Sequence, residues 1–160
     1  QNSELLELGC GSGLIAMVAA EKGAIVTATD INPVAVEFLK KNCGHNKLQL
    51  HIFHSDLFDE IPEKAYDIIA INPPYYKKDP QTLRDHAWFC GENGAYFERL
   101  FASLHRYMHA GTETLMVLFD GCDMDMIHGF AAANSFTLNC VQSKQNMLEK
   151  NFIYKIEKIK

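Results

Sequence analysis

The chain has 160 residues, of which 48% are hydrophobic and 22% are charged, and its formal net charge is −5. This composition is typical of a globular protein with one core, so we expect a single domain over residues 1–160. The acidic balance argues against a nucleic-acid binder that relies on a broad basic surface, and no apolar run reaches the roughly 20 residues of a membrane span.

The first half of the chain alternates between strand and helix patterns. Residues 4–9 (ELLELG) are a short apolar run that ends in glycine, and residues 24–30 (AIVTATD) are β-branched, so both predict buried strands. Residues 12–23 predict a helix between them, with Gly23 as its stop. The apolar residues at helical spacing in this segment are Leu14, Ile15, Val18 and Ala19.

A second helix and two further strands follow. Residues 31–44 predict a helix in which Asn32 can cap the amino end and a proline takes the first helical position. The predicted buried face of this helix is Ala35, Phe38 and Leu39. Residues 48–54 alternate as a strand, and residues 66–71 (YDIIAI) are a nearly continuous apolar strand.

The second half begins with a long irregular stretch, residues 72–92, which is typical of a functional loop. Residues 94–111 then predict a helix. The apolar face of that helix is Phe97, Leu100, Phe101, Leu104 and Met108. The remaining predicted elements are a strand at 113–119, a helix at 123–134 and strands at 136–142 and 152–159.

This alternation predicts an α/β fold, a mostly parallel seven-stranded sheet with helices on both faces. In open sheets of this kind, ligands bind beyond the carboxyl ends of the strands. The glycine-rich turn and the polar segments described below all fall at such positions, so we expect the functional site there.

Cysteine and histidine do not form a metal-binding pattern. The five cysteines are scattered singly with no C-x-x-C pair, which is typical of reduced thiols in a cytoplasmic protein. His105 and His109 lie four residues apart on the predicted helix, with no acidic partner or third ligand beside them. We therefore expect an exposed helix face there and no metal site.

The turn ELGCGSG (7–13) joins the first strand to the first helix. Gly9, Gly11 and Gly13 let the backbone approach a ligand closely and adopt positive φ. The spacing is G-x-G-x-G, not G-x-G-x-x-G, and no Gly-Lys-Ser/Thr follows, which excludes a phosphate-gripping P-loop. The alternative is a tight strand-to-helix connection that binds nothing.

Two aspartates follow the next strands. Asp30 ends the second strand, where an acid typically binds ribose hydroxyls; the alternative is a helix cap. Asp56, in HSDLF (54–58), can accept a hydrogen bond from an adenine amino group, with Leu57 offering a backbone N–H and an apolar wall. The alternative for Asp56 is a turn residue. The glycine turn and Asp30 together predict a nucleoside-containing cofactor.

The segment INPPYY (71–76) follows the fourth predicted strand. Asn72 offers a carbonyl oxygen and an NH₂ group, whereas Pro73 has a carbonyl but no N–H. Two rigid neighbouring acceptors suit a substrate NH₂ group, and Tyr75 can stack on a planar group conjugated to that nitrogen. The alternative is a turn with surface aromatic residues.

These segments together resemble a class I S-adenosylmethionine-dependent methyltransferase. LLELGCGSGLIA resembles the cofactor motif of that class, TATDIN its ribose acid, and INPPY the N-P-P-Y signature of amino-group methyltransferases. The resemblance spans nearly the whole chain and implies a Rossmann-like fold. Within the class, AWFCGENGAYFERLF (87–101) and the tail KNFIYKIEK make the chain similar to the HemK-type protein glutamine N5-methyltransferases.

The resemblance implies a substrate and partners. In the HemK-type family the target is a glutamine in the Gly-Gly-Gln loop of a peptide-chain release factor, and the branch that the tail resembles uses a small activating subunit. Related N-P-P-Y enzymes methylate adenine N6 or guanine N2 in RNA or DNA, and Lys77 and Lys78 suit a nucleic-acid backbone as well as a peptide. Relatives carry a segment before the first strand that we expect this chain to lack.

The resemblance also implies roles for individual residues. Glu7 would orient the glycine turn or meet the cofactor's ammonium group, and Asn72 and Pro73 would hold the substrate NH₂ while Tyr75 stacks on it. The remaining cofactor-binding residues would be Gly9, Gly11, Gly13, Asp30, Ile31, Asp56 and Leu57, with Asn72 also near the cofactor. The remaining substrate-binding residues would be Pro74, Tyr76 and Lys77.

Two competing hypotheses belong to other functional classes. A nicotinamide oxidoreductase would share the glycine turn and Asp30, but it lacks the G-x-G-x-x-G spacing and gives the N-P-P-Y segment no role. A non-catalytic cofactor-binding interaction module would keep the cofactor residues without turnover. Cofactor binding and methyl transfer, measured separately, distinguish these hypotheses from a methyltransferase.

Overall fold

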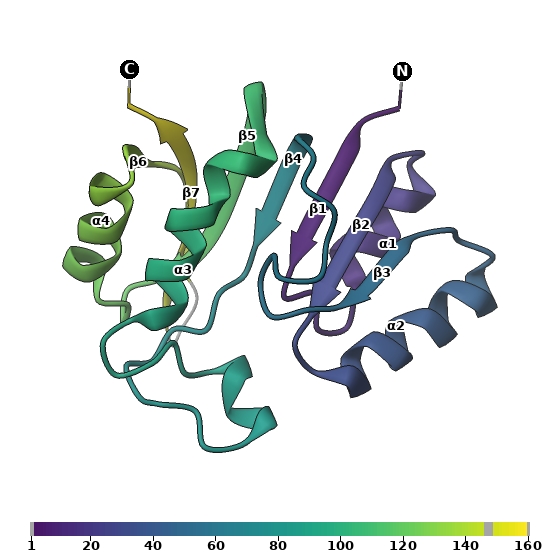
Figure 1. Ribbon diagram of the computed structural model, residues 1–160, viewed down its shortest axis with the longest axis horizontal. Helices are drawn as coiled ribbons and strands as arrows, with labels where there is room; N and C mark the ends of the chain where they lie inside the picture. The colour runs from purple at the N-terminus through teal and green to yellow at the C-terminus, as the bar shows by residue number, and fades with distance from the viewer. Residues whose placement is uncertain (1, 146–148, 160) are drawn as a thin grey trace. The chain divides into compact units, whose positions relative to one another are not determined.

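The computed structural model describes residues 2–145 and 149–159 (Figure 1). In chain order the elements are β1 (Glu4–Leu8), α1 (Leu14–Glu21), β2 (Ile25–Asp30), α2 (Pro33–Asn46), β3 (His51–His54), β4 (Tyr66–Ile71), η1 (Leu83–Ala87), α3 (Ala95–Leu104), η2 (His105–Tyr107), β5 (Met108–Phe119), α4 (Met124–Ala133), β6 (Phe136–Gln145) and β7 (Lys150–Lys158). Within the described residues, seven strands form one sheet in the order β3-β2-β1-β4-β5-β7-β6. The predicted α/β fold with a mostly parallel seven-stranded sheet is confirmed.

The chain divides into two compact units. The first comprises the residues up to Ile71 together with Arg106–Thr112, and the second comprises Asn72–His105 together with the residues from Glu113 onward. Strand β5 therefore begins in the first unit and continues in the second. The expectation of a single domain stays a prediction.

The first unit contains the parallel strands. β1 lies between β2 and β4 and runs parallel to both, and β3 runs parallel to β2. Leu8, the last residue of β1, is opposite Thr29 of β2 and Ile71 of β4, while Asp30 is opposite His54 of β3. Because parallel strands end on the same side of a sheet, the segments that follow β1, β2 and β3 share one edge, where α/β proteins bind ligands.

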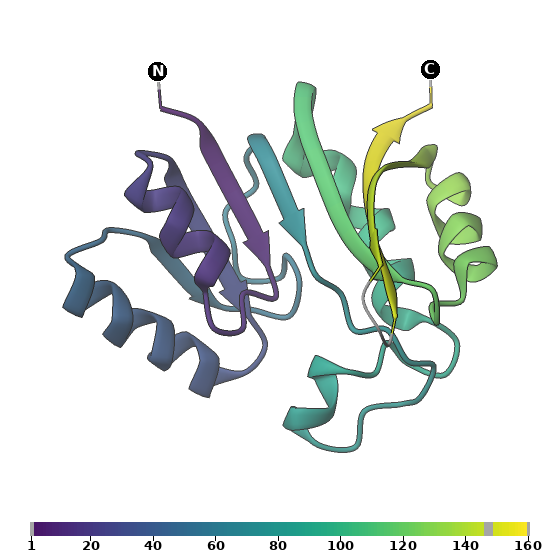
Figure 2. The ribbon, with the colours of Figure 1, turned by 180° about the vertical axis from the view of Figure 1, so that it is seen from behind.

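Helix α1 buries a different face from the one that its apolar residues suggest. Leu14, Ile15 and Val18 are 64%, 46% and 41% exposed, whereas Ala16 is fully buried and Ala19 packs against the same core cluster. The sequence LIAMVAA is apolar around the whole helix, so its period does not select the buried face. Figure 2 shows α1 lying against the sheet. Ala16 is a buried member of the core cluster that also contains Val26 and Ala28 of β2.

Helix α2 begins as predicted. A proline takes the first helical position, and Asn32 Oδ1 accepts a hydrogen bond from the N–H of Val34 at 3.0 Å. The buried residues of α2 are Val36, Leu39 and Cys43. The predicted face was therefore right for Leu39 and wrong for Phe38, which is 52% exposed, and for Ala35, which is only partly buried. Leu39 belongs to two overlapping apolar stripes of the helix. Packing against the sheet buries the stripe that contains Val36 and Cys43.

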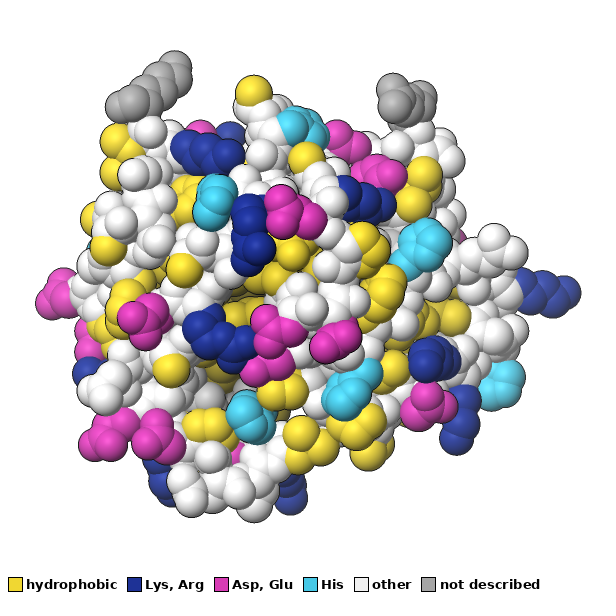
Figure 3. All heavy atoms as spheres, viewed as in Figure 1, with side chains coloured by type: hydrophobic (Ala, Val, Ile, Leu, Met, Phe, Trp, Pro, Cys, Tyr) yellow, Lys and Arg dark blue, Asp and Glu magenta, His cyan; other side chains and the backbone are white. Residues whose placement is uncertain are grey.

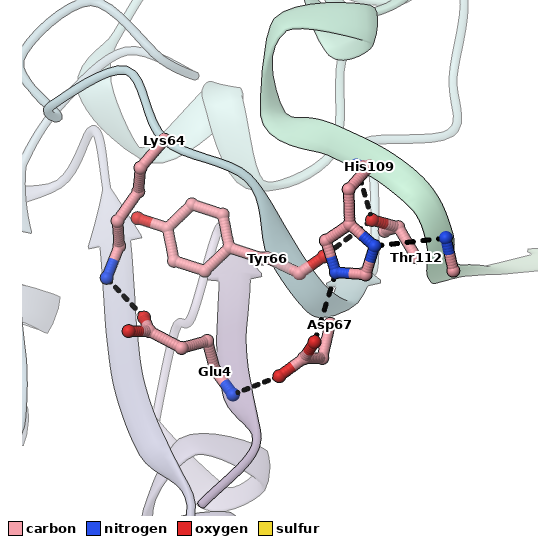
Figure 4. A network of polar contacts seen from close by, with 7 residues as sticks. Glu4, Lys64, Tyr66, Asp67, His109 and Thr112 are labelled. Atoms are coloured by element: carbon pink, nitrogen blue, oxygen red, sulfur yellow. Dashed lines mark hydrogen bonds and ion pairs between the residues drawn. The ribbon is translucent and has the colours of Figure 1, made fainter. Parts of the chain in front are cut away.

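A network of polar contacts joins β1, β4 and β5 at the end opposite the ligand edge (Figure 4). Asp67 accepts a hydrogen bond from the N–H of Glu4 at 2.8 Å and one from Nε2 of His109 at 3.0 Å. The Thr112 hydroxyl donates to the carbonyl of Tyr66 at 2.6 Å. The Glu4 N–H and then His109 stabilise the carboxylate, so the pKa of Asp67 lies below its usual value.

This network corrects the predicted helix over residues 94–111. Helix α3 is shorter, and β5 begins at Met108, so neither Met108 nor His109 lies on a helix with His105. The absence of an acidic partner for His109 was also a wrong expectation, because Asp67 pairs with it from 42 positions earlier. Neighbouring strands bring such residues together, and a helical pattern along the chain does not reveal them.

The second unit contains an antiparallel part of the sheet. Strand β7 lies between β5 and β6 and is antiparallel to both, with a register shift in β6 between Cys140 and Gln142. Strands β6 and β7 are longer than predicted. Helix α3 packs as predicted through Phe97, Leu100, Phe101 and Leu104, all of which are fully buried.

In residues 2–145 and 149–159, no helix combines the length and the apolar character needed to cross a membrane. All five cysteines are free thiols, and Cys140 alone of these five is exposed. Burial first, and then the carboxylates of Asp30 and Glu7, together raise the pKa of Cys10 to about 12. Cys10 is therefore an unreactive neutral thiol although it lies within the glycine turn.

Candidate functional site

The glycine turn after β1 needs glycine for two different reasons. Gly9, Gly11 and Gly13 all have positive φ, between 52° and 72°. A Cβ on Gly11 would meet open space, so only its backbone conformation opposes a side chain there. A Cβ on Gly13 would also lie 2.3 Å from Cδ1 of Leu39, which is fully buried. The turn is therefore a tightly packed strand-to-helix connection with an open backbone face at Gly11.

Asp30, at the end of β2, holds this turn. Its Oδ2 accepts a hydrogen bond from the N–H of Gly11 at 2.8 Å, and its Oδ1 accepts one from the N–H of Asn32 at 2.8 Å. The amino-terminal cap of α2 is Asn32, so the alternative role of Asp30 as that cap does not apply. A carboxylate has about four acceptor positions, and those left over can receive ribose hydroxyls.

Glu7, near the end of β1, is 6% exposed. Its Oε2 accepts a hydrogen bond from the N–H of Ala16 at 2.8 Å, which fixes the first turn of α1 beside the glycine turn. Burial is the main cause that raises the pKa of Glu7 to about 7; the charge of Asp30 contributes to the rise, and the Ala16 hydrogen bond opposes it. A ligand cation near this buried carboxyl group would favour its ionised form.

A pocket of about 390 Å³ lies beyond the carboxyl ends of β2 and β3. Its lining residues are Ile31, His54, Ser55, Asp56, Asp59 and Glu60. Two of the predicted cofactor residues, Ile31 and Asp56, are among them. The other four were not predicted, although the acidic run DLFDE directly after the strand was a usable signal. The volume falls in the range of small-molecule sites.

The pocket wall is built by the loop after β3. The His54 ring nitrogen Nε2 lies 2.9 Å from the carbonyl of Ile31, and the N–H of Ser55 donates to the carbonyl of Asp30 at 3.0 Å. Leu57 does not line the pocket; it is buried and has φ of 54°, while its carbonyl accepts a hydrogen bond from the Ser55 hydroxyl at 3.1 Å. Its predicted contact with a cofactor stays a prediction.

The N-P-P-Y segment opens the second unit and begins directly after β4. Asn72 is exposed, while Pro73 and Pro74 are buried. Tyr75 and Tyr76 both donate their backbone N–H to the carbonyl oxygen of Trp88, at 3.0 and 2.8 Å. Two prolines without N–H groups are thus followed by two amides that bind one distant carbonyl, which makes the corner rigid.

The loop 72–92 is more ordered than the predicted irregular stretch. It contains the 3₁₀ helix η1, which has a capping box formed by Thr82 and Asp85. Its two arms are joined by hydrogen bonds from the N–H of Cys90 to the carbonyl of Tyr76 at 2.9 Å and from Gly91 to Lys78 at 3.1 Å. A folded loop of this kind presents a preformed surface.

Aromatic packing holds the two tyrosines. The rings of Tyr75 and Tyr76 meet Phe119 edge-on, with centroids 5.0 and 5.8 Å apart. The Tyr75 hydroxyl donates a hydrogen bond to Asn72 Oδ1. Burial raises the pKa of Tyr75 from 10 to about 12, so its hydroxyl keeps its proton well above neutral pH. Tyr76 is 48% exposed and offers its ring to solvent.

The first lysine after the signature is paired. Lys77 Nζ lies 2.9 Å from Oδ2 of Asp123, whose Oδ1 caps α4 by accepting the N–H of Met126 at 3.0 Å. This hydrogen bond and the charge of Asp123 raise the pKa of Lys77. Lys78 Nζ lies 5.0 Å from the centre of the Phe89 ring. Both lysines therefore already have partners in their own unit.

The described residues also lack the side-chain clusters that bind metal ions. Among residues 2–145 and 149–159, no group of three or more histidine, cysteine, aspartate or glutamate side chains is arranged to hold a metal ion. The acidic residues at the ligand edge, Asp30 and Asp56, instead lie beside a glycine turn and a pocket, an arrangement that suits an organic cation with hydroxyl and amino groups.

Comparison with known proteins identifies similar sequences. A family model described as the methyltransferase small domain matches residues 1–90. A candidate protein N5-glutamine methyltransferase of Methanocaldococcus jannaschii is 43% identical over 117 residues, which are 69% of this chain and 59% of that protein. A ribosomal RNA small subunit methyltransferase C of Haemophilus influenzae is 37% identical over 100 residues, which are 57% of this chain and 30% of that protein.

A solved structure matches the whole fold. It is the E. cuniculi Mtq2-Trm112 complex, responsible for methylation of the eRF1 translation termination factor, which aligns with a TM-score of 0.71 over 99% of this chain and 86% of that chain. At 18% identity this likeness concerns the fold alone. The chain spans less than two thirds of the length of either curated relative.

Proposed function

Since the chain belongs to the methyltransferase small domain family, we propose that it is an S-adenosylmethionine-dependent methyltransferase that acts on the side-chain amide nitrogen of a protein glutamine. The observation that carries the proposal is the rigid N-P-P-Y corner, which places Asn72 and the donor-free Pro73 directly after β4. The 43% identity to a candidate protein N5-glutamine methyltransferase supports this choice of substrate.

The first unit has residues that fit the cofactor. Glu7 and Asp30 place two carboxyl groups beside the glycine turn, and Asp56 contributes a third at the pocket that Ile31 also lines. Such a set suits a cation with ribose hydroxyls and an adenine amino group. S-adenosylmethionine, when bound, supplies the methyl group of its sulfonium, so that an N–C bond forms as an S–C bond breaks and one proton leaves nitrogen.

The second unit has residues that fit the amide. Asn72 Oδ1 and the carbonyl of Pro73 accept the two hydrogens of the substrate NH₂, and Pro74 keeps the corner stiff. Tyr75 covers the planar amide. Because positive charge develops on the nitrogen, two fixed acceptor dipoles favour the transition state over the ground state. Asparagine is no base near neutral pH, so positioning supplies most of the rate.

A protein substrate suits the charges of the loop better than RNA does. Residues 72–92 contain three basic side chains (Lys77, Lys78 and Arg84) and three acidic ones (Asp79, Asp85 and Glu92), so the loop carries no net charge. Lys77 is paired with Asp123, and the whole chain has a net charge of −5. Binding to a nucleic-acid backbone needs unpaired cations that release counterions.

RNA stays the second candidate substrate. The 37% identity to a ribosomal RNA methyltransferase favours it, and so do two exposed aromatic rings, Tyr76 and Trp88, on which bases could stack. The chemistry at Asn72 and Pro73 would then be the same, with adenine N6 or guanine N2 in place of the amide. The non-catalytic cofactor-binding module is the third candidate and predicts binding without transfer.

The proposed partners are a peptide-chain release factor as substrate and a small activating subunit. The Mtq2-Trm112 complex, named for methylation of a termination factor, supports both by analogy of fold. The five free thiols support a reducing compartment, so we place the protein in the cytoplasm.

The test combines binding with transfer. In calorimetric titration the purified chain should bind S-adenosylmethionine and not NAD. The purified chain, with tritiated-methyl cofactor and cell lysate, should label material that survives RNase and is lost to protease. Label that is lost to RNase and survives protease would favour RNA, and binding of NAD without binding of S-adenosylmethionine would overturn the proposal.

A further inference from the structure

The Tyr75 hydroxyl contacts the side chain that the proposed function makes the central acceptor. It donates a hydrogen bond to Oδ1 of Asn72, three residues earlier in the same corner. The stacking role proposed for Tyr75 uses only its ring, and phenylalanine would fulfil that role equally well. The hydroxyl group therefore has no task in the mechanism described so far.

The position of this hydroxyl is set by contacts that do not involve Asn72. The backbone N–H of Tyr75 is bound to the carbonyl of Trp88 at 3.0 Å, and the ring packs edge-on against Phe119, with an interplanar angle of 72°. Burial, with smaller contributions from Cys122 and Glu149, raises the pKa of Tyr75 from 10 to about 12, so the hydroxyl is a donor at neutral pH and well above it. Packing thus presents a fixed O–H to the corner.

Among residues 2–145 and 149–159, the bond from Tyr75 is the one hydrogen bond that holds the Asn72 side chain. Its side chain is exposed, and the terminal amide torsion of asparagine has a broad, roughly two-fold preference in which oxygen and nitrogen can exchange places. An amide turned the other way would present an NH₂ group to the substrate NH₂, and two donors cannot bind each other. A fixed donor at Oδ1 favours one of the two orientations.

We propose that the Tyr75 hydroxyl is a positioning group that holds the Asn72 amide with Oδ1 toward the substrate nitrogen. An amide oxygen accepts two hydrogen bonds, so Oδ1 can hold the tyrosine proton and one substrate hydrogen together. The inference rests on the proposed function, because it assigns the second lone pair to the substrate amide. It adds to that function a reason for tyrosine, in preference to phenylalanine, at position 75.

The test replaces the hydroxyl and keeps the ring. In Tyr75→Phe we expect kcat to fall about tenfold, as the loss of one net hydrogen bond implies, with the KM for the protein substrate within about twofold of wild type. Tyr154→Phe is the matched control, because Tyr154 is another partly buried tyrosine of the same unit, outside the corner. Wild-type kcat in Tyr75→Phe, or a raised KM with kcat unchanged, would overturn the proposal.

A second readout does not depend on turnover. In ¹⁵N-labelled chain without cofactor, the side-chain NH₂ resonances of Asn72 can be assigned by their disappearance in Asn72→Asp. Tyr75→Phe should move these resonances, and Tyr154→Phe should leave them in place. If the two Asn72 resonances did not move in Tyr75→Phe, the hydrogen bond between Tyr75 and Asn72 would be refuted. If the wild-type chain neither binds nor uses S-adenosylmethionine, the proposed function fails while the contact between Tyr75 and Asn72 is still decided.

Discussion

Asp30 and Gly11, 19 positions apart, are joined by a hydrogen bond of 2.8 Å from the glycine N–H to Oδ2 of the carboxylate. The acid at the end of β2 and the glycine turn after β1 are therefore one structural unit before any ligand is bound. A residue assigned only to ribose recognition would not need this bond. The contact makes Asp30 both a ligand-binding group and a support for the turn.

Removing the Asp30 side chain should weaken cofactor binding and destabilise the turn together. Asp30→Ala leaves the N–H groups of Gly11 and Asn32 without their acceptors, and we expect a loss of about 1–3 kcal/mol in the free energy of unfolding. Asp30→Asn keeps one acceptor oxygen and should lose less. Chemical denaturation and calorimetric titration measure the two effects, and an Asp30→Ala chain of wild-type stability would contradict the supporting role.

Asn72→Ala should abolish turnover and leave cofactor affinity nearly intact. One of the two acceptors is lost, and removal of a single preorganised dipole costs about a hundredfold or more in rate. The cofactor dissociation constant should stay within about twofold of wild type. Asn139→Ala is the matched control, because Asn139 is an exposed asparagine of the same unit that pairs with Glu157. If Asn72→Ala also lost the cofactor in calorimetry, the division of roles would be wrong.

Glu7→Gln should change how stability depends on pH. The folded chain holds the Glu7 proton more tightly than the unfolded chain, with a pKa of about 7 against 4.5. Stability from this group is therefore present below pH 4.5, declines as the pH rises toward 7 and is lost above it, by about 3 kcal/mol in all. Glutamine keeps an acceptor for the Ala16 N–H and does not titrate.

We therefore expect Glu7→Gln to flatten the decline between pH 5 and 8 and to raise the free energy of unfolding at pH 8. Urea denaturation of the chain without cofactor measures both. The same variant should bind S-adenosylmethionine more weakly, because it cannot supply a negative charge. A pH slope equal to that of wild type would show that Glu7 titrates normally in the folded chain.

Salt should separate the two candidate substrates. Because Lys77 is paired with Asp123 and the loop 72–92 is neutral, methylation of a protein substrate should change little between 50 and 200 mM salt. Binding of RNA through several phosphates would fall by about a thousandfold or more over that range. Initial rates at the two salt concentrations, with release factor and with RNA, provide the comparison.

Gly13→Ala should destabilise the chain, and Gly129→Ala should not. A Cβ at Gly13 would lie 2.3 Å from Leu39 Cδ1 in a residue with φ of 72°, which we expect to cost about 1–3 kcal/mol. Gly129 lies within α4 with open space around its would-be Cβ, so alanine there should be neutral or slightly stabilising. Thermal unfolding of the two variants is the measurement, and equal Tm values would contradict the packing.

The sequence predicts the strands of the first unit well because their signals are local, whereas the ligand-binding roles of the residues that follow them stay predictions. Continuous apolar runs ending in glycine or aspartate mark β1 and β2, and the cap at Asn32 is readable from a single tripeptide. Helix faces are less predictable: α1 is apolar on all sides, and α2 has two overlapping stripes through Leu39. Which stripe is buried depends on the sheet beneath, and the helix sequence does not contain that information.

Contacts between side chains far apart in the sequence could not be predicted either. The sequence around His109 gives no sign that Asp67 is its partner, and the sequence around Lys77 gives no sign of Asp123. Each pair forms because the fold brings distant segments together. The charge of Lys77 suggested a contact for nucleic acid until its partner was seen. The hydrogen bond between Asp30 and Gly11 is another such contact. Both residues were predicted to belong to the site, but the bond between them was not predicted.

Trp88 supports the N-P-P-Y corner through its main chain, since its carbonyl receives the N–H groups of both Tyr75 and Tyr76 while its indole is 53% exposed. Every amino acid has the same backbone carbonyl, so a substitution at position 88 keeps both hydrogen bonds from Tyr75 and Tyr76. Inserting or deleting one residue between the two arms of the loop would instead shift that carbonyl out of register. Selection here should therefore preserve the length of the loop and leave the identity of residue 88 open to change with the substrate.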